Sequence, residues 1–381
     1  MVQKLETHTR IDVADVLRGL AVMGIIVLHS IEHFNFYSFP DTSTQSAWLN
    51  FSDKAIWDGL FFMFGGKAYA VFALLFGFSF FIQDNNQRMR GNDFRLRFCW
   101  RLILLFILGN INAAFFTAEV LVLYSLVGFI LPLTCRLKDK WLFILACVLL
   151  IQPLPLYYVI CACIDPSFVT PSIPTGSYWG AAFQVQSHGT FLETLRVNLW
   201  EGQIASLAWA WDHGRVFQTA ALFLFGLLIG RRGLFLKENL KFWNKVLCGA
   251  LIAFFPLYGL GNMLPGFIVS KSILTPLLLI ITSLSKFAVI FAFYRTNLHD
   301  WLMKITPYGK MSLTNYITQS IIGSLLFYNW GLALHSQLGI TASFLVGVVL
   351  FIVQLAFCRW WMSRHAHGPL EYLWKRATWL K

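Results

Sequence analysis

The chain has 381 residues, of which 57% are hydrophobic, 17% aromatic and only 13% charged, with a mean hydropathy of +0.63 and a net charge of +12. Soluble globular domains carry roughly 25% charged residues, so this composition excludes an ordinary soluble enzyme. The seven cysteines lie in or beside apolar segments, at spacings that fit neither the disulfide framework of a secreted domain nor a zinc site, and no metal is predicted.

Apolar runs separated by turn signals predict an all-α protein, a polytopic bundle of about ten transmembrane helices. No second domain or internal repeat is evident, so residues 1–381 are expected to form a single integral membrane domain. In chain order the predicted spans are 14–34, 59–83, 98–116, 119–135, 141–164, 216–230, 243–264, 268–294, 311–334 and 340–361.

Two segments outside these spans are expected to lie at the membrane surface. Segment 165–215 begins with the Pro- and Ser-rich run DPSFVTPSIPTGS and continues with GTFLETLRVNLWEG, whose apolar residues recur at helical spacing. This pattern predicts an external loop with an amphipathic helix at the outer interface. The tail 359–381, RWWMSRHAHGPLEYLWKRATWLK, is predicted to be its cytoplasmic counterpart.

Lysine and arginine gather at one end of the predicted spans. If the N-terminus is cytoplasmic, 24 of the 30 basic residues fall on the cytoplasmic side. They cluster in 4–18, 88–101, 136–140, 231–245, 295–310 and 359–381. Because basic residues are retained in cytoplasmic loops, both termini are predicted to be cytoplasmic. The charge of +12 then reflects topology and attraction to anionic lipids, and no nucleic-acid partner is expected.

The stretch LRGLAVMGIIVLH (Leu17–His29), within the first predicted span, holds two polar residues that are costly in a membrane, Arg18 and His29. Eleven residues at about 100° each make three turns plus roughly 20°, so both side chains share one helix face. They are separated by about 16 Å along the axis. Asp15 can pair with Arg18, and Glu32 and His33 flank His29 at helical spacing.

Two interpretations of this face remain open. Arg18 can be a membrane anchor and His29 an interhelical hydrogen-bonding residue. Alternatively, Arg18 binds a phosphate while His29 takes a proton from a hydroxyl or amine, with Glu32 orienting its ring, so that a long thioester lies between them.

Other intramembrane polar residues are candidates for a binding site. Lys67 and Lys286 each need a carboxylate, a carbonyl or an anionic ligand, or else belong to a structural ion pair. Asn112 and Glu119 are candidates for the wall of the same cavity. The arginine-rich run QRMRGNDFRLRFCWR suits either a solvated loop or nucleotide phosphates. The P-loop, HEXXH and G-x-S-x-G motifs do not occur, which argues against an ATP-driven transporter and two common hydrolase classes.

Four stretches resemble the YeiB family of bacterial membrane proteins: RGLAVMGIIVLH, GKAYAVFALLFG, GKMSLTNYITQSIIGSLLFYNWGL and HGPLEYLWKR. That family is similar to transmembrane acyltransferases, including OafA-like sugar O-acetyltransferases and the lysosomal heparan glucosaminide acetyltransferase. The resemblance implies a helix bundle in the bacterial inner membrane that passes an acyl group from cytoplasmic acyl-CoA to an acceptor outside. Arg18 and His29 reproduce the Arg-x10-His spacing of OafA-like enzymes.

The chain departs from the YeiB pattern at two positions. His29 stands where YeiB relatives often have Asn, and Asn112 stands where they often have His. The exchange is either drift at unrelated sites or a sign that both positions face one cavity. Side chains more than about 12 Å apart cannot share one reacting centre.

The leading expectation is an acyl-CoA-dependent membrane acyltransferase, with acetyl-CoA as the donor and a glycan or lipid-linked acceptor. The expected site residues are, for catalysis, His29 and Glu32; for the cofactor, Arg18, Lys67 and Lys286; and for the substrate, Asn112, Glu119 and His33. The alternatives are a transporter or flippase for an anionic amphiphile and a non-catalytic scaffold. Membrane lipids are expected partners, and the oligomeric state, a homodimer included, is left open.

Overall fold

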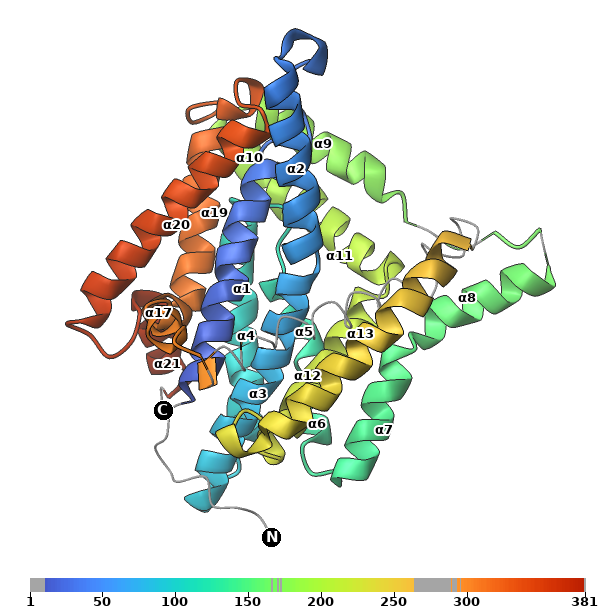
Figure 1. The fold of residues 1–381 in the computed structure, drawn as a ribbon, viewed down its shortest axis with the longest axis vertical. Helices are drawn as coiled ribbons and strands as arrows, with labels where there is room; N and C mark the ends of the chain where they lie inside the picture. The colour runs from blue at the N-terminus through green and yellow to red at the C-terminus, as the bar shows by residue number, and fades with distance from the viewer. Residues whose placement is uncertain are drawn as a thin grey trace.

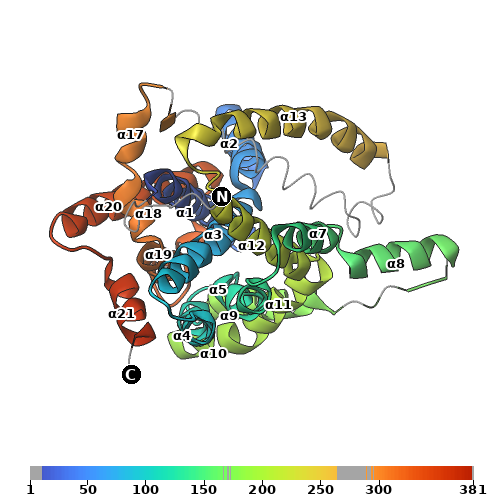
Figure 2. The same ribbon diagram turned by 90° about the horizontal axis from the view of Figure 1, so that it is seen from below.

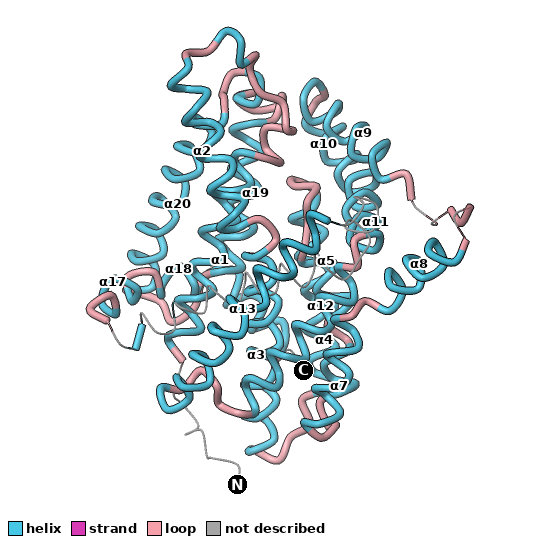
Figure 3. The backbone as a smooth tube through the Cα atoms, turned by 45° about the vertical axis from the view of Figure 1, so that its right-hand side comes forward, coloured by secondary structure: helices cyan, strands magenta, loops and turns pink. Residues whose placement is uncertain are grey.

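A computed structural model describes residues 11–165, 167–169, 171, 173–263, 289, 293–294 and 296–379. All regular structure in these residues is helical, without a strand (Figure 3). The α-helices of the first half are α1 (Asp12–Ile31), α2 (Ala47–Phe64), α3 (Lys67–Met89), α4 (Arg95–Ala113), α5 (Leu121–Val127), α6 (Ile130–Thr134), α7 (Asp139–Leu150) and α8 (Pro153–Ile164). The others are α9 (Thr175–His188), α10 (Phe191–Val197), α11 (Gln203–Asp212), α12 (Arg215–Arg231), α13 (Leu240–Met263), α17 (His299–Met303), α18 (Thr306–Lys310), α19 (Ser312–Phe327), α20 (Ile340–Met362) and α21 (Pro369–Thr378).

The N-terminal helix α1 is at the centre of the bundle (Figures 1 and 2). It packs against α2, α3, α18, α19 and α20, and 78% of its apolar stretch is buried. In α20 only 17% of the corresponding stretch is buried, and its side chains Leu345, Val349, Ile352 and Val353 are exposed. An apolar surface of this kind needs a lipid environment, whereas α1 is shielded by protein.

Several helices are long and apolar enough to cross a membrane. Five of the described helical segments meet this condition, or seven if each of two bent pairs counts as one span. The bent pairs are α7 with α8, at 44°, and the segment Phe191–Asp212 with α12, at 73°. The predicted span 119–135 is divided into α5 and α6, and 268–294 lies largely outside the described residues. The chain is therefore a helical membrane protein, while the number of ten spans stays a prediction.

Two glycine turns aim the ends of helices at the interior of the bundle. Gly66, with φ +65°, separates α2 from α3, and Gly214, with φ +64°, precedes α12. A Cβ on Gly214 would overlap the side-chain amide of Gln152, and the positive φ itself favours glycine at this position. The turn at Gly214 makes the 73° bend and places Arg215 at the start of α12.

Segment 165–215, predicted to be an external loop with an amphipathic helix, contains the helix α10, and its place at the membrane surface stays a prediction. The helix begins at Phe191, where the Thr190 side chain and Glu193 form a capping box. A π-helical turn at Asn198–Gly202 joins it to α11. Asn198 donates to the carbonyl of Ala114 at 2.9 Å and accepts from Gln186 at 2.7 Å, so this turn is fixed to both α4 and α9.

Ion pairs join the chain segments at one end of the bundle, the lower end in Figure 1. Arg136 binds Asp84 at 3.1 Å and Asp93 at 3.3 Å, and Arg231 binds Asp139 at 2.9 Å. Hydrogen bonds from Arg95 hold the pKa of Asp93, in the loop before α4, below its ordinary value.

The C-terminal helix α21 docks on the basic start of α4. The indole of Trp374 donates to the carbonyl of Arg101 at 3.3 Å, and Arg101 lies over that indole at 4.0 Å. Glu371 accepts hydrogen bonds from the backbone N–H groups of Leu313 and Thr314, at 2.8 and 3.0 Å. It thereby satisfies free N–H groups at the start of α19. Part of the predicted interfacial tail is thus packed against α4 and α19.

Candidate functional site

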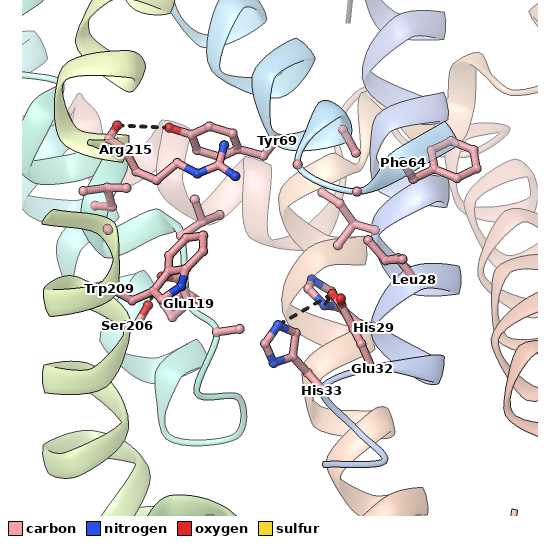
Figure 4. Close-up of a pocket in the computed structure, with 18 of the residues that line it drawn as sticks. Leu28, His29, Glu32, His33, Phe64, Tyr69, Glu119, Ser206, Trp209 and Arg215 are labelled. Atoms are coloured by element: carbon pink, nitrogen blue, oxygen red, sulfur yellow. Dashed lines mark hydrogen bonds and ion pairs between the residues drawn. The ribbon is translucent and has the colours of Figure 1, made fainter. Parts of the chain in front are cut away.

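A cavity of about 700 Å³ lies between α1, α11 and the start of α12 (Figure 4). Most of its wall is apolar or aromatic. Its ionisable residues come from three places: His29, Glu32 and His33 from the end of α1, Glu119 from the loop before α5, and Arg215 from α12. This space is called the histidine cavity below. A concave, mostly apolar pocket with a few convergent polar groups is the usual form of a small-molecule site.

His29, Glu32 and His33 form one compact cluster, called the His–Glu–His cluster. His29 lies in the last turn of α1, which ends at Ile31. Glu32 and His33 follow His29 by three and four residues, at the end of the helix. The Nδ1 atom of His29 lies 3.3 Å from Oε1 of Glu32, and Nε2 of His33 lies 3.6 Å from the same oxygen. The side chains are only 14%, 8% and 17% exposed, so the carboxylate is largely shielded from bulk solvent but open to the cavity.

Aromatic side chains hold the two imidazole rings in place. Phe116 contacts the ring of His29 edge-on, with 4.7 Å between centroids, and that of His33 at 5.7 Å. Trp179, from α9, lies 5.9 Å from the ring of His33. Packing on several sides fixes the side-chain rotamers, which is what a preorganised site requires.

Glu119 and Asn112 bind each other. The amide of Asn112 donates to the carboxylate of Glu119, which also accepts from the backbone N–H of Leu121. Both side chains are buried, but Glu119 lines the cavity whereas Asn112 lies behind it. Asn112 therefore reaches the cavity through Glu119, and a direct contact with His29 is not among those formed.

Arg215 is a cavity residue that sequence reasoning missed. Its guanidinium lies 5.0 Å from the ring of Tyr69 and 5.4 Å from that of Trp209, and donates to Gln218 at 2.9 Å. Figure 4 shows it across the cavity from the His–Glu–His cluster. The sequence signal was an arginine directly after a glycine at the start of an apolar run, which was counted only for topology.

A second cavity of about 210 Å³ contains three cationic side chains, Arg18, Arg101 and Lys310, and is called the arginine cavity. Arg18 binds Asp15 at 2.8 Å and Ser79 at 2.9 Å. The buried Nε of Arg101 has no hydrogen-bond partner within the described part of the chain. A guanidinium with a free donor beside other cations is suited to bind an anion.

Three aromatic side chains, Phe72, Tyr124 and Tyr316, line both cavities and are called the aromatic partition. Arg18 and His29, which the sequence places on one face of a helix, line the arginine cavity and the histidine cavity respectively. The helical geometry expected for this pair is therefore consistent with two neighbouring cavities that meet at a common wall.

Of the two predicted cofactor lysines, Lys67 and Lys286, the structure describes only Lys67. Lys67 donates to the carbonyls of Phe61, at 3.2 Å, and Phe62, which are in the last turn of α2. It thus satisfies free carbonyls at a helix end and is absent from the lining of the histidine cavity. Lys286 lies outside the described residues.

The comparisons with known proteins find one family model and several bacterial relatives. Residues 229–381 match a family model described as "Protein of unknown function (DUF418)". Over 98% of its length the chain is 26% identical to the "Uncharacterized protein YxaH" of Bacillus subtilis (strain 168), of which it covers 95%. It is 23% identical to an "Uncharacterized 39.9 kDa protein in amylase 3'region" of Bacillus acidopullulyticus, over 97% of this chain and 94% of that one.

A shorter match is to the "Uncharacterized protein YeiB" of Escherichia coli (strain K12), with 32% identity over 20% of each chain. No solved structure gives a significant match. The matches to DUF418 and YeiB support the family resemblance indicated by the sequence motifs. They carry no information on activity.

Proposed function

We propose that the chain is an acyl-CoA-dependent membrane acyltransferase, with an acetyl group as the expected cargo. The observation that carries this proposal is the pair of adjoining cavities, one cationic and one with a His–carboxylate pair, that share the aromatic partition. A thioester donor has the same two parts: an anionic nucleotide at one end and a reactive carbonyl at the other. The proposal also draws on the similarity of the YeiB family to transmembrane acyltransferases.

The arginine cavity is the proposed site for the phosphates of the donor. Arg18 and Arg101 supply forked donors and Lys310 a point charge. Arg101 brings a buried Nε that has no other hydrogen-bond partner in the described structure. The chain attached to the nucleotide then passes the aromatic partition, which requires movement of its rings, and delivers the thioester carbonyl to the histidine cavity.

His29 is the proposed general base. The acceptor hydroxyl gives its proton to the imidazole as its oxygen bonds to the thioester carbonyl carbon; the carbon–sulfur bond then breaks, and the departing thiolate takes the proton. Glu32, 3.3 Å from Nδ1 of His29, stabilises the imidazolium formed in between. Trp179 and Trp209 offer flat apolar faces at the cavity wall, which suit a sugar ring as the acceptor.

The proposal also fixes an orientation in the bacterial inner membrane. The end that carries the ion pairs of Arg136 and Arg231 faces the cytoplasm, together with both termini, and the donor enters from there. The histidine cavity then opens toward the outside, next to helices α9 and α11, where a glycan or lipid-linked acceptor arrives.

Binding of the donor tests the first half of this proposal. CoA and acetyl-CoA are titrated into the purified protein in detergent, and wild type is compared with Arg18→Ala and with the exposed control Arg90→Ala. We expect Arg18→Ala to weaken binding by about 1.5–3 kcal/mol, as for loss of a charged hydrogen bond, and Arg90→Ala to leave it unchanged. Absence of CoA binding at millimolar concentration would reject the proposal.

Transfer of label tests the second half. Membranes that contain the protein receive acetyl-CoA labelled in the acetyl group, and the label is followed into glycolipid and glycan fractions. His29→Ala should reduce the rate by about 100-fold or more, the usual contribution of a general base, without changing the melting temperature. Transfer at the wild-type rate in His29→Ala would remove His29 from catalysis.

A transporter for an anionic amphiphile is the second candidate. It is favoured by Arg215, a cation that faces a mostly apolar cavity, and by a partition that separates two cavities. Under this alternative, label from acetyl-CoA stays on CoA, and an anionic lipid or sugar crosses the membrane only when the protein is present.

A further inference from the structure

We propose that the His–Glu–His cluster is a binding site for a divalent transition-metal ion of the zinc class. Sequence analysis predicts no metal, because the cysteines show no zinc spacing and HEXXH is absent. The structure nevertheless brings one ligand atom from each of His29, Glu32 and His33 to within 4.8 Å of the others. Two imidazoles and one carboxylate are a donor set that zinc accepts in catalytic sites.

The distances within the cluster fit a common central ion. At metal–ligand distances of 2.0–2.1 Å, two ligands of a tetrahedral ion are about 3.4 Å apart. The separations between the Glu32 oxygen and the two nitrogens are 3.3 and 3.6 Å. One ligand atom from each of the three residues lies within 4.8 Å of the other two, a separation that a small rotation of the imidazole rings can shorten.

Hydrogen bonds account for only part of the cluster: in the described residues the Tyr37 hydroxyl lies 3.5 Å from Nε2 of His33. The buried Nδ1 of His29 lies close to Glu32, yet it has no hydrogen-bond partner within the described structure. Lone pairs that converge on one ion do not point at each other, so a short contact without hydrogen-bond geometry is expected between ligands. Nδ1 of His33 is likewise buried without a partner in that part of the chain.

The kind of site follows from its surroundings. Structural zinc sites are closed by four protein ligands, whereas catalytic sites have three and leave one position for water or substrate. Here three donors lie at the edge of a cavity of about 700 Å³, into which the fourth position would open. Imidazole ligands favour zinc, cobalt or nickel over calcium and magnesium, which prefer oxygen.

For the chemistry of the site, the inference rests on the proposed function. A hydroxyl bound at the open position of a zinc ion loses its proton more readily, so the ion would take over the activation of the acceptor. His29 would then act as a ligand in the metal-bound protein. Binding of the metal does not depend on acyl transfer and can be measured without it.

The experiment uses full-length protein without a polyhistidine tag, purified in detergent and freed of metal by chelation. Zn²⁺ alone is titrated by calorimetry, and Co²⁺ alone by its visible absorption, which is intense in a tetrahedral N/O environment. The variants are His33→Ala and the nearly isosteric Glu32→Gln. His188→Ala, an exposed histidine of α9 outside the cavity lining, is the matched control.

We expect one Zn²⁺ per chain in wild type and in His188→Ala. In both cluster variants the affinity should fall by more than the roughly 10- to 100-fold that the loss of an outer-shell partner costs. A melting temperature close to that of wild type shows that a variant is folded, and Glu32→Gln provides a second test if His33→Ala is not. No binding by wild type, or equal binding by the folded cluster variants, would overturn the inference.

The outcome is separable from that of the proposed function. Acyl transfer by metal-free wild type that also binds no Zn²⁺ would reject the metal site and leave the acyltransferase standing. Zn²⁺ binding that depends on the cluster, in a protein that binds no CoA, would support the metal site and reject acyl transfer from CoA.

Discussion

At the scale of single residues, the free-energy cost of a polar side chain in a membrane helix correctly indicated part of the cavity lining. Arg18, His29 and Glu32 are polar in or next to an apolar run, and the structure places all three at cavity walls. Arg215 and Tyr316 can be recognised as cavity residues only in the folded chain, because the turn at Gly214 and the packing of α19 decide where their side chains point. Lys67 is the opposite case. Its charge is also costly in an apolar run, but a backbone carbonyl six residues earlier accepts its hydrogen bond, so the cost does not indicate a binding site.

The position of Arg215 leads to a prediction about the acceptor. Arg215→Ala should raise KM for the acceptor, because an anionic or polar acceptor loses a charged hydrogen bond worth about 1.5–3 kcal/mol. Binding of CoA should not change, since Arg215 does not line the arginine cavity. Initial rates at varied acceptor concentration give the KM, with the exposed Arg196, outside both cavities, replaced by Ala as the control. Weaker CoA binding in Arg215→Ala would contradict this division of roles.

At the scale of elements, apolar runs predicted the positions of several long helices, but the predicted span 59–83 was wrong, because α2 ends at Phe64 and α3 begins at Lys67 after the turn at Gly66. The predicted 340–361 corresponds to α20, Ile340–Met362, because a run of lipid-facing residues has clear polar ends. The predicted 119–135 is divided between α5 and α6, and 141–164 is bent by 44°. Such breaks depend on tertiary contacts: Gly128, at the end of α5, lies against Leu102 of α4 and has no room for a Cβ. Hydropathy does not report contacts of this kind.

The packing of α3 against α12 leads to a prediction about stability. A Cβ on Gly77 would overlap the carbonyl oxygen of Phe223, and one on Gly226 would overlap that of Leu74. The two helices therefore approach through a pair of small residues, as membrane helices commonly do. Gly77→Val should destabilise the fold by about 1–3 kcal/mol or more, the cost of overpacking. Thermal unfolding in detergent measures it.

Gly176→Val is the matched control for this substitution. Gly176 is also helical, in α9, but a Cβ there meets nothing within 4 Å. Its variant should melt close to the wild-type temperature. Equal melting temperatures for Gly77→Val and Gly176→Val would show that the α3–α12 contact is looser than the structure indicates.

At the scale of the whole molecule, the proposed orientation leads to a prediction about topology. Basic residues are retained in the cytoplasm, so a fluorescent protein fused to the C-terminus should fluoresce and alkaline phosphatase fused there should be inactive. Phosphatase fused after residue 171, in the predicted external segment, should be active. The reverse pattern at either position would contradict the proposed direction of acyl transfer.

The tertiary structure also explains why the role of one motif, the arginine-rich run QRMRGNDFRLRFCWR, could not be predicted from the sequence. The arginine-rich run before and within α4 was assigned either to solvent or to nucleotide phosphates. In the structure Arg97 and Arg101 donate to Thr378 at 3.0 and 3.2 Å, and so hold α21 in place. Arg101 does this while it lines the arginine cavity. A contact between residues 277 positions apart leaves no periodicity that a sequence pattern can report.

Because Glu371 caps α19 from a later part of the chain, α19 is synthesised before the residue that caps it. The capping carboxylate follows Thr314 by 57 residues. Because proteins are synthesised from the N-terminus, α19 enters the membrane before its cap has left the ribosome. The arginine cavity, which Glu371 and Trp374 help to enclose, is therefore completed only after residues 371–374 have been synthesised. A truncated translation product would insert into the membrane with this cavity still open.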